Sequence, residues 1–302
     1  MAQITQNYSY LIASGLRKVI FNKYNSYPEQ YSQIFNVHTS SKNFEEDAMT
    51  TGLGLFPVKE EGAAVAYDDP VQGWKKRYTH VEYGLAFRVS EVMQEDDLYS
   101  IMAKMGKALG KGAAESVEIV CADIFNNGFS TATANLGPDG KSLFATDHPL
   151  YKAGGTEQNR LTTDADLSVT SLRQAINDVA DMRDHANLRQ NTKPVKLLTH
   201  PNEEFAAIEL LKSTLRHDTA ENATNAFKKW GLTPIVNNFL TASKAWFLIA
   251  DKDDHDLNFF WRRKFKVKTG EDFDTGDLKT KGTMRFVTSW GDFRGVYGSP
   301  GV

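Results

Sequence analysis

The sequence predicts an α+β protein in which one very long helix supports a sheet, and a second, α/β lobe is inserted into the first. Three observations predict this. Apolar residues follow helical spacing over residues 96–127, alternating strand patterns occur at 81–89 and again after residue 257, and short mixed elements fill 190–256. A chain of 302 residues can bury a large core and form two lobes.

The predicted helix over 96–127 carries its apolar side chains on one stripe, at spacings of three and four residues. Negative charge from Asp96 and Asp97 suits its positive end, and Asn127-Gly128 can end it in a left-handed turn. A helix of this length spans roughly 48 Å, so other elements should pack along it. Its three interior glycines predict a bend or a close approach by another backbone. They are Gly106, Gly110 and Gly112.

Residues 1–45 are predicted to form an extended arm that begins with a short amphipathic helix. Aromatic residues alternate here with polar ones and show little regular periodicity, so they need a surface to cover. The arm can pack on its own domain or lie across a neighbouring subunit, and the sequence leaves both alternatives open. The aromatic residues proposed to make contact are Tyr24, Tyr27, Tyr31 and Phe35.

Residues 46–80 are predicted to form a long protruding hairpin. Two strand-like pieces, Leu53–Lys59 and Ala63–Tyr67, flank a Glu60-Glu61-Gly62 turn. A single hairpin is only marginally stable in water, so something outside it should hold it. Its acidic and basic residues can pair with each other or match a neighbouring subunit. These charged residues are Lys59, Glu60, Glu61, Asp68, Asp69, Lys75, Lys76 and Arg77.

The sheet begins with a predicted strand at Val81–Val89 whose odd-numbered side chains form one buried face. The two C-terminal strand patterns, separated by an acidic turn at Gly270–Asp277, should pair with it and pack on the long helix. A helix is predicted over Asp164–Ala186, with Ser168 or Thr170 as its cap. Further strands are predicted at Val195–Thr199, Thr233–Val236 and Ala245–Ala250, and a helix at Glu203–Ser213 with Phe205, Ile208, Leu211 and Leu215 as its apolar stripe.

Composition excludes several classes of protein. The net charge of −3 gives no support to a protein that wraps nucleic acid. The N-terminus shows no secretory signal pattern, and the longest apolar run, at 245–250, is too short to cross a bilayer. The single cysteine, Cys121, forms no internal disulfide and is predicted to pack in the core.

No catalytic, cofactor-binding or metal site is predicted. The seven histidines lack the spacing of a zinc site. The best candidate for catalysis is an acid/base pair of Asp147 and His148, which would serve a hydrolase. Residues 251–256 resemble part of a calcium loop but lack its glycine and its final acid. The basic strand Arg262–Lys268 could bind phosphates, although acidic residues follow it directly.

Two stretches carry a family resemblance. They are GPDGKSLFATDHPL at 137–150, after the long helix, and WGDFRGVYG at 290–298. Together with the hairpin, the helix and the inserted lobe, they make the chain similar to the major capsid protein of tailed phages, and most of all to the Mu-like major head subunit.

The resemblance implies the tailed-phage major capsid fold. Residues 1–45 would be the N-terminal arm, 46–80 the extended loop, 81–189 and 257–302 the peripheral domain with its spine helix at 96–127, and 190–256 the axial domain. The protein would self-assemble into pentamers and hexamers of an icosahedral head that encloses double-stranded DNA without reading its sequence.

The resemblance also implies partners. They are copies of the chain itself, a separate scaffolding protein, a portal and in some cases a decoration protein, with assembly in the host cytoplasm, no membrane and a final place in the virion. Some members of the family join Lys and Asn side chains covalently across subunits, and Lys59, Lys75 and Lys76 lie in the corresponding loop. The alternatives are a hydrolase that uses Asp147 and His148, and a nanocompartment shell protein of the same fold.

Overall fold

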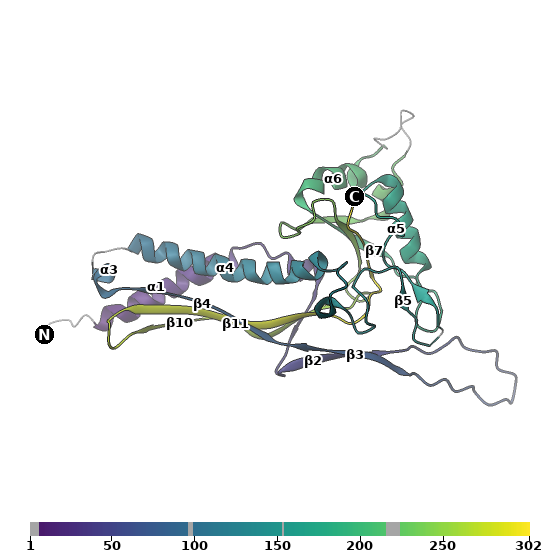
Figure 1. Ribbon diagram of the computed structural model, residues 1–302, viewed down its shortest axis with the longest axis horizontal. Coiled ribbons are helices and arrows are strands. Elements are labelled where there is room, and N and C mark those ends of the chain that lie inside the picture. The colour runs from purple at the N-terminus through teal and green to yellow at the C-terminus, as the bar shows by residue number, and fades with distance from the viewer. Residues whose placement is uncertain (1–5, 96–98, 153, 216–223) are drawn as a thin grey trace.

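The computed structural model describes residues 6–95, 99–152, 154–215 and 224–302. It shows an elongated body of sheet and helices, a second lobe that rises from one end of this body, and a long loop that extends beyond both (Figure 1). The helices are α1 (Gln6–Asn25), α2 (Tyr31–Ile34), α3 (Glu91–Glu95), α4 (Tyr99–Asn126), α5 (Val169–Asp181), α6 (Glu204–Lys212) and α7 (Ala226–Trp230), with short 3-10 turns η1 (Thr133–Asn135) and η2 (Pro201–Glu203). None of the described helices is long and apolar enough to span a bilayer.

Twelve strands are assigned in these residues. They are β1 (Asn36–Thr39), β2 (Phe44–Thr50), β3 (Gln72–Thr79), β4 (Val81–Val89), β5 (His148–Pro149), β6 (Thr156–Glu157), β7 (Pro194–Thr199), β8 (Thr233–Val236), β9 (Trp246–Ala250), β10 (Leu257–Glu271), β11 (Leu278–Trp290) and β12 (Val296–Ser299).

The body is built on a four-stranded sheet in the order β1-β10-β11-β4. Strands β10 and β11 form a long antiparallel hairpin, β4 pairs antiparallel with β11, and β1 lies parallel to β10. The predicted pairing with residues 81–89 is therefore confirmed for β11, whereas β10 pairs with β11 and β1. One expectation about β4 was wrong. Val81 and Leu85 are 49% and 65% exposed rather than buried, because β4 is an edge strand that α4 covers only in part.

Helix α4 packs along this sheet as the predicted spine, and its described part, Tyr99–Asn126, lies within the predicted range of 96–127. Asp96, Asp97 and Leu98 lie outside the described residues. The buried stripe of α4 agrees with the predicted apolar pattern and includes Cys121. Because burial raises the pKa of the Cys121 thiol well above its usual value, this cysteine is a packed core residue.

The arm folds back onto its own subunit. Helix α1 runs beside α4, and the two backbones come so close that a Cβ added at Gly110 would lie 2.4 Å from the carbonyl oxygen of Ile20. The Glu118 carboxylate of α4 accepts hydrogen bonds from the backbone amides of Gln30 (2.8 Å) and Tyr31 (3.0 Å) at the start of α2. The interior glycines predicted either a bend or a close approach by another backbone, and Gly110 marks a close approach between two helices.

The second lobe contains a sheet in the order β12-β9-β7-β8, flanked by α5 and α6 (Figure 1). Ser168 caps α5 through a reciprocal pair of hydrogen bonds with Ser171, so this helix begins at Val169 and not at residue 164. Strand β12 pairs with β9, whose five residues are all buried. The range 257–302 predicted for the peripheral domain is therefore shared between two sheets, because residues 291–295 turn the chain from one lobe to the other.

The predicted apolar stripe of α6 is also corrected. Leu211 is buried, but Phe205 is 77% exposed and Leu215 is 46% exposed, whereas Ala207 and Leu210 lie in the core. Helix α6 therefore turns the face of Ala207 and Leu210 toward the sheet. The chain enters this helix through η2, and the spacing of apolar residues does not give the direction of that entry.

Candidate functional site

The extended loop (residues 46–80) leaves the body at the junction of the two lobes. Its root is the antiparallel ladder of β2 and β3. Arg77 joins the two strands, because its guanidinium lies 2.7 Å from the Glu46 carboxylate and 4.0 Å from the centre of the Phe44 ring. The Tyr78 hydroxyl donates a hydrogen bond to the carbonyl of Trp290, which fixes the root to the end of β11.

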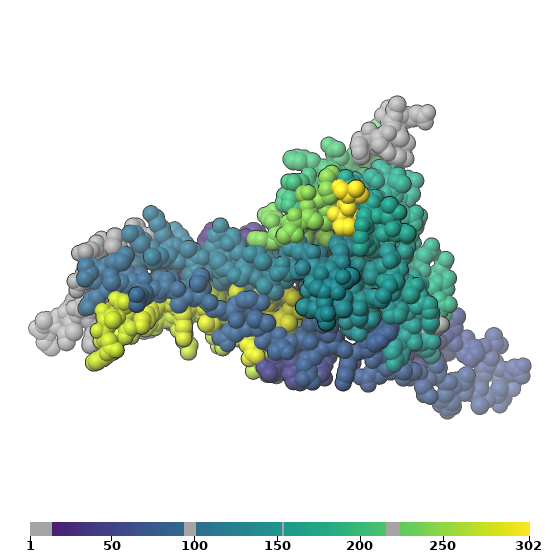
Figure 2. Space-filling view, viewed as in Figure 1, coloured from purple at the N-terminus to yellow at the C-terminus, as the bar shows by residue number. Residues whose placement is uncertain are grey.

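The predicted strands at 53–59 and 63–67 are not formed. Residues 51–71, the loop tip, contain no strand, and the ladder ends where Thr51 and Val71 exchange two hydrogen bonds of 2.9 Å. Beyond that point no second strand face or helix covers the chain. Figure 2 shows the result, a narrow projection that leaves the second lobe at its lower edge.

Two contacts orient the loop against the second lobe of the same subunit. The Trp74 ring packs edge-on against Tyr151, with ring centres 5.0 Å apart. The Lys152 ammonium lies 3.0 Å from the Asp68 carboxylate, which also accepts a hydrogen bond of 2.7 Å from the amide of Gly54. The hydrogen bonds from Gly54 and then Lys152 lower the pKa of Asp68, so this carboxylate stays charged and holds both limbs of the loop tip.

The loop tip exposes a series of large apolar side chains. The most exposed are Phe56 (97%), Val58 (97%), Tyr67 (96%) and Leu55 (78%). Single exposed apolar residues are ordinary on a protein surface, but a contiguous group on a projecting segment is typical of an interaction site. These residues were predicted to form strands, and that prediction is wrong. Their glycine, proline and charged neighbours are typical of an unpaired segment and could have indicated one.

The charged residues of the loop are arranged differently from the hairpin pairing considered above. Arg77 pairs with Glu46, and Lys76 donates to the carbonyl of Leu136, so neither reaches the acidic residues of the tip. Asp68 pairs with Lys152 of the second lobe. The other predicted contact residues of the loop are exposed; these are Lys59, Glu60, Glu61, Asp69 and Lys75.

The four aromatic residues of the arm have less surface to offer a neighbour. Phe35 is fully buried and Tyr31 is 8% exposed, and they pack on Phe125 and Phe259 of their own subunit. Tyr24 stacks on Phe265 at 4.9 Å, and the Tyr27 hydroxyl lies 3.4 Å from Glu115. Burial therefore removes Tyr31 and Phe35 from the candidate contact residues.

A polar cavity of about 470 Å³ lies beside the loop root. Its lining brings together Asp47 of β2 and Asp256 at the start of β10, and both side chains pack against Gly291. Burial and then the nearby Asp47 carboxylate raise the pKa of Asp256 to about 6. In the described residues no three histidine, cysteine or acidic side chains are arranged to hold a metal ion. The raised pKa of Asp256 is the chemical property of this cavity.

The acid/base pair Asp147–His148 is not formed. Asp147 is exposed and pairs with Lys141, whereas His148 is fully buried. The His148 ring stacks on Phe293 at 3.8 Å, and its Nδ1 lies 2.6 Å from the Asp139 carboxylate. A histidine enclosed in this way cannot reach a substrate, so the hydrolase alternative is wrong as it was formulated.

The other two candidate motifs are surface features. Arg263 of the basic strand pairs with Glu82 of β4. Residues 251–254 form a turn closed by a 2.9 Å hydrogen bond from the amide of Asp254 to the carbonyl of Asp251. The acidic side chains of this turn do not form a calcium site, because no three such side chains in the described part of the chain are placed to hold a metal ion.

Comparisons with known proteins agree on one fold. No curated protein matches this chain in sequence. Among solved structures, the procapsid of bacteriophage JBD30 matches with a TM-score of 0.53 and 18% identity, over 98% of this chain and 76% of that one. A structure from Mycobacterium phage Adephagia matches with a TM-score of 0.54 and 11% identity, over 91% of each chain. A virus-like particle from Pyrococcus furiosus matches with a TM-score of 0.53 and 11% identity, over 94% of this chain and 97% of that one.

These matches confirm the predicted α+β fold of tailed-phage capsids. The sequence model of the family described as phage capsid protein matches residues 75–299, from β3 to the last strand. The chain belongs to the phage capsid protein family, and it is a structural protein of the phage head.

Proposed function

We propose that this protein is the major head subunit, which assembles with copies of itself into pentamers and hexamers of an icosahedral shell around double-stranded DNA. The observation that carries the proposal is the loop tip. Phe56 and Val58 are each 97% exposed on a segment that has no core of its own. Apolar surface of this kind gains stability when a second copy covers it.

The contact set proposed for this loop combines apolar and charged residues. The apolar members are Leu55, Phe56, Val58 and Tyr67, and the charged members are Lys59, Glu60, Glu61 and Asp69. The apolar side chains supply buried area, while the charges set the register between subunits and oppose wrong pairings. Since a loop at one end of a subunit contacts a different surface on the next, the contact is heterologous and closes into rings.

The further partners proposed are a separate scaffolding protein, a portal and a decoration protein. The JBD30 capsid is described as decorated with minor capsid protein trimers, which supports decoration as a general property of such shells. The proposed domains are an arm (1–45), the extended loop (46–80), a peripheral domain and an axial domain, and the Mu-like major head subunit is the proposed subfamily. The protein would assemble in the host cytoplasm and remain in the virion.

Electron microscopy and size-exclusion chromatography of the purified full chain test the proposal. Wild-type protein should form rings or closed shells, and Phe56→Ser with Val58→Ser should leave unassembled subunits with an unchanged melting temperature. Phe205→Ser is the matched control, because Phe205 is an exposed aromatic on α6, away from the loop. A wild-type chain that stays monomeric at every salt and scaffold concentration would refute the proposal.

A nanocompartment shell of the same fold is the second candidate function. The match to a virus-like particle from Pyrococcus furiosus supports it. The contents of particles produced with the neighbouring genes distinguish the two, since a phage head protects double-stranded DNA from nuclease and a nanocompartment retains protein cargo.

A further inference from the structure

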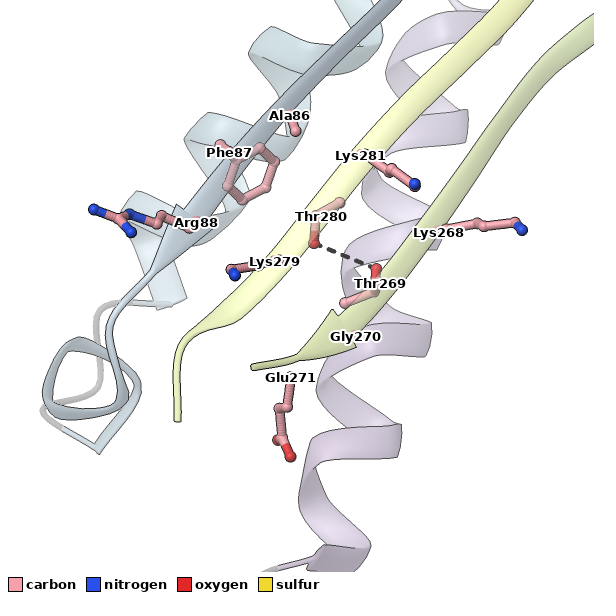
Figure 3. A pocket seen from close by; sticks show the side chains of 10 residues that line it. All are labelled: Ala86, Phe87, Arg88, Lys268, Thr269, Gly270, Glu271, Lys279, Thr280 and Lys281. Atoms are coloured by element: carbon pink, nitrogen blue, oxygen red, sulfur yellow. Dashed lines mark hydrogen bonds between the residues drawn. The ribbon is translucent and has the colours of Figure 1, made fainter. Parts of the chain in front are cut away.

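A shallow groove of about 550 Å³ lies at the far end of the body sheet, where β4 and β10 end and β11 begins. Its lining contains four basic side chains and the Glu271 carboxylate, and Ala86 and Gly270 leave space between the strands' longer side chains (Figure 3). These basic residues are Arg88, Lys268, Lys279 and Lys281. In Figure 3 the strands lie in front of α1 and α4, so the view is onto the sheet face turned away from the helices.

The charges of this groove are not balanced within the subunit. Lys279 pairs with Asp272, and Arg88 lies 3.9 Å from Asp277. Lys268 and Lys281, in contrast, occupy directly opposite positions on β10 and β11, and neither has an ion pair with any described residue. Like charges directly opposite each other destabilise a sheet. An anionic group placed between the two ammonium groups would relieve this repulsion.

The tip of the β10–β11 hairpin (residues 272–277) has the complementary character. Phe273 is fully exposed, at 102% of its reference area. Glu271 and Asp274 flank it, and both are exposed and without an ion pair among the described residues. After the internal pairs of Lys279 and Arg88 are subtracted, Glu271 and Asp274 remain unpaired within the described chain beside Phe273, and Lys268 and Lys281 remain unpaired in the groove, at whose edge Glu271 also lies.

We propose that the β10–β11 tip of one subunit docks into this groove on a second copy of the chain, with Phe273 between the lysine stems and with Glu271 and Asp274 facing Lys268 and Lys281. The groove volume lies within the range of sites that enclose small ligands, and a phenyl ring fits that size. The contact is separate from the extended loop, which lies at the opposite end of the molecule (Figure 1). It rests on the proposed function, because it needs a subunit that self-associates.

Tip and groove lie on the same end of one chain, so they suit a closed arrangement in which each subunit both donates a tip and receives one. The loop would then join subunits at one end and the tip would join them at the other. Two such contacts at opposite ends are what a closed shell needs, since a single contact yields only rings.

Sedimentation velocity and electron microscopy of the full chain test this contact. Phe273→Ala should weaken shell formation by at least about tenfold, whereas Phe205→Ala should have no effect. Reversing the tip (Glu271→Lys, Asp274→Lys) or the groove (Lys268→Glu, Lys281→Glu) should each abolish shells at unchanged melting temperature. Combining both reversals in one chain should restore them, and Lys212→Glu is the charge control on α6.

The possible failures of this experiment are distinguishable. If wild-type shells form and depend on Phe56 and Val58, but the tip and groove variants assemble normally, the tip contact is refuted and the proposed function stands. If wild type never assembles, both are refuted. If the groove reversal abolishes binding of double-stranded DNA while the tip variants still form shells, the lysines face nucleic acid and the tip contact is again refuted.

Discussion

His148 shows how burial decides between a catalytic and a structural role. Its ring is enclosed by Phe293, Asp139 and Asn159, with its two nitrogens 2.6 Å and 3.2 Å from oxygen atoms of the last two. The sequence placed Asp147 beside it, but adjacent residues in an extended segment point to opposite sides. The true carboxylate partner comes from a turn nine residues earlier, a contact that no local pattern encodes.

Replacement of this histidine should therefore affect stability and no reaction. His148→Ala leaves the buried Asp139 carboxylate without its partner and removes a stacked ring, so we expect a loss of about 2–4 kcal/mol in the free energy of unfolding. Urea denaturation of unassembled subunits measures it. Asp147→Ala, which removes an exposed ion pair, should change stability by less than about 1 kcal/mol. A near-neutral His148→Ala would contradict the structural role.

Asp256 makes the stability of the loop root depend on pH. Its pKa is about 6 in the folded chain, against 3.8 without burial and the neighbouring carboxylates of Asp47 and Asp292. A raised carboxyl pKa stabilises the folded state at low pH, and this contribution is lost as pH rises from about 4 through 6. Wild-type stability should therefore fall over that interval.

Asp256→Asn should remove this dependence. The amide stays neutral and retains an acceptor for Asn258, so the variant should be more stable than wild type by roughly 1–3 kcal/mol at pH 7–8. Below about pH 4 the difference should vanish, because both side chains are then uncharged. Thermal unfolding of unassembled subunits between pH 4 and 8 measures it, and a constant difference across this range would contradict the assignment.

At the scale of elements, the crossing of α1 and α4 depends on one glycine more than on its neighbours. A Cβ at Gly110 would meet backbone atoms of Ile20 and Tyr24 at 2.4 Å and 3.3 Å, and backbone cannot rotate away as a side chain can. Nothing lies within 4 Å of a Cβ at Gly112, only two residues later. The two positions form a matched pair.

Gly110→Ala should separate the two helices and destabilise the subunit by about 1–3 kcal/mol. Gly112→Ala should stabilise it by up to about 1 kcal/mol, since alanine favours a helix and meets no obstacle. Circular dichroism melts of both variants measure the shifts. Equal effects of the same sign would show that helix propensity, and not the close approach, determines the result.

The elements most accurately predicted from sequence were those with a complete periodic pattern. Strands β4 and β8 have the predicted bounds, and α4 ends one residue before its predicted end at residue 127. Errors arose where tertiary contacts decide. The loop tip has strand-like composition but lacks a pairing partner, and β12 joins the second sheet only because the chain turns at residues 291–295.

The contact role of the range 46–80 stays a prediction, while the structure shows how its residues are arranged. The range 46–80 was predicted to need support from outside, and the structure shows an uncovered tip on a short ladder. The pairing of Asp68 with Lys152 and the packing of Trp74 on Tyr151 join segments about 80 residues apart. Such contacts depend on how the two lobes sit together, so a single sequence without a structure could not provide them.

At the scale of the whole molecule, exposed apolar side chains lie at both ends of the described structure. The sequence left open whether the arm packs on its own subunit or on a neighbour, and the structure shows it packed on its own subunit. The extended loop at one end and the β10–β11 tip at the other are uncovered. A subunit with a closed centre and two open ends is suited to repeated association, because each end can be covered only by another molecule.

This asymmetry predicts a change in proteolysis on assembly. Lys59 is the only lysine or arginine in the loop tip, residues 51–71, and it is exposed on a segment without regular structure. Among the sites in the described residues, trypsin should therefore cut free subunits first after Lys59, since cleavage needs little local unfolding there. Assembled particles should resist this cut by at least about tenfold, because the neighbouring copy covers the tip.

Mass spectrometry of the first fragments, from matched free and assembled samples, measures both rates. Lys59→Gln should remove the early cut from free subunits, which identifies Lys59 as the cleavage site. Cleavage at equal rates in subunits and particles would show that the tip remains uncovered in the shell. The extended loop would then face solvent in the finished particle, and the contacts between subunits would have to lie on the sheet and the second lobe.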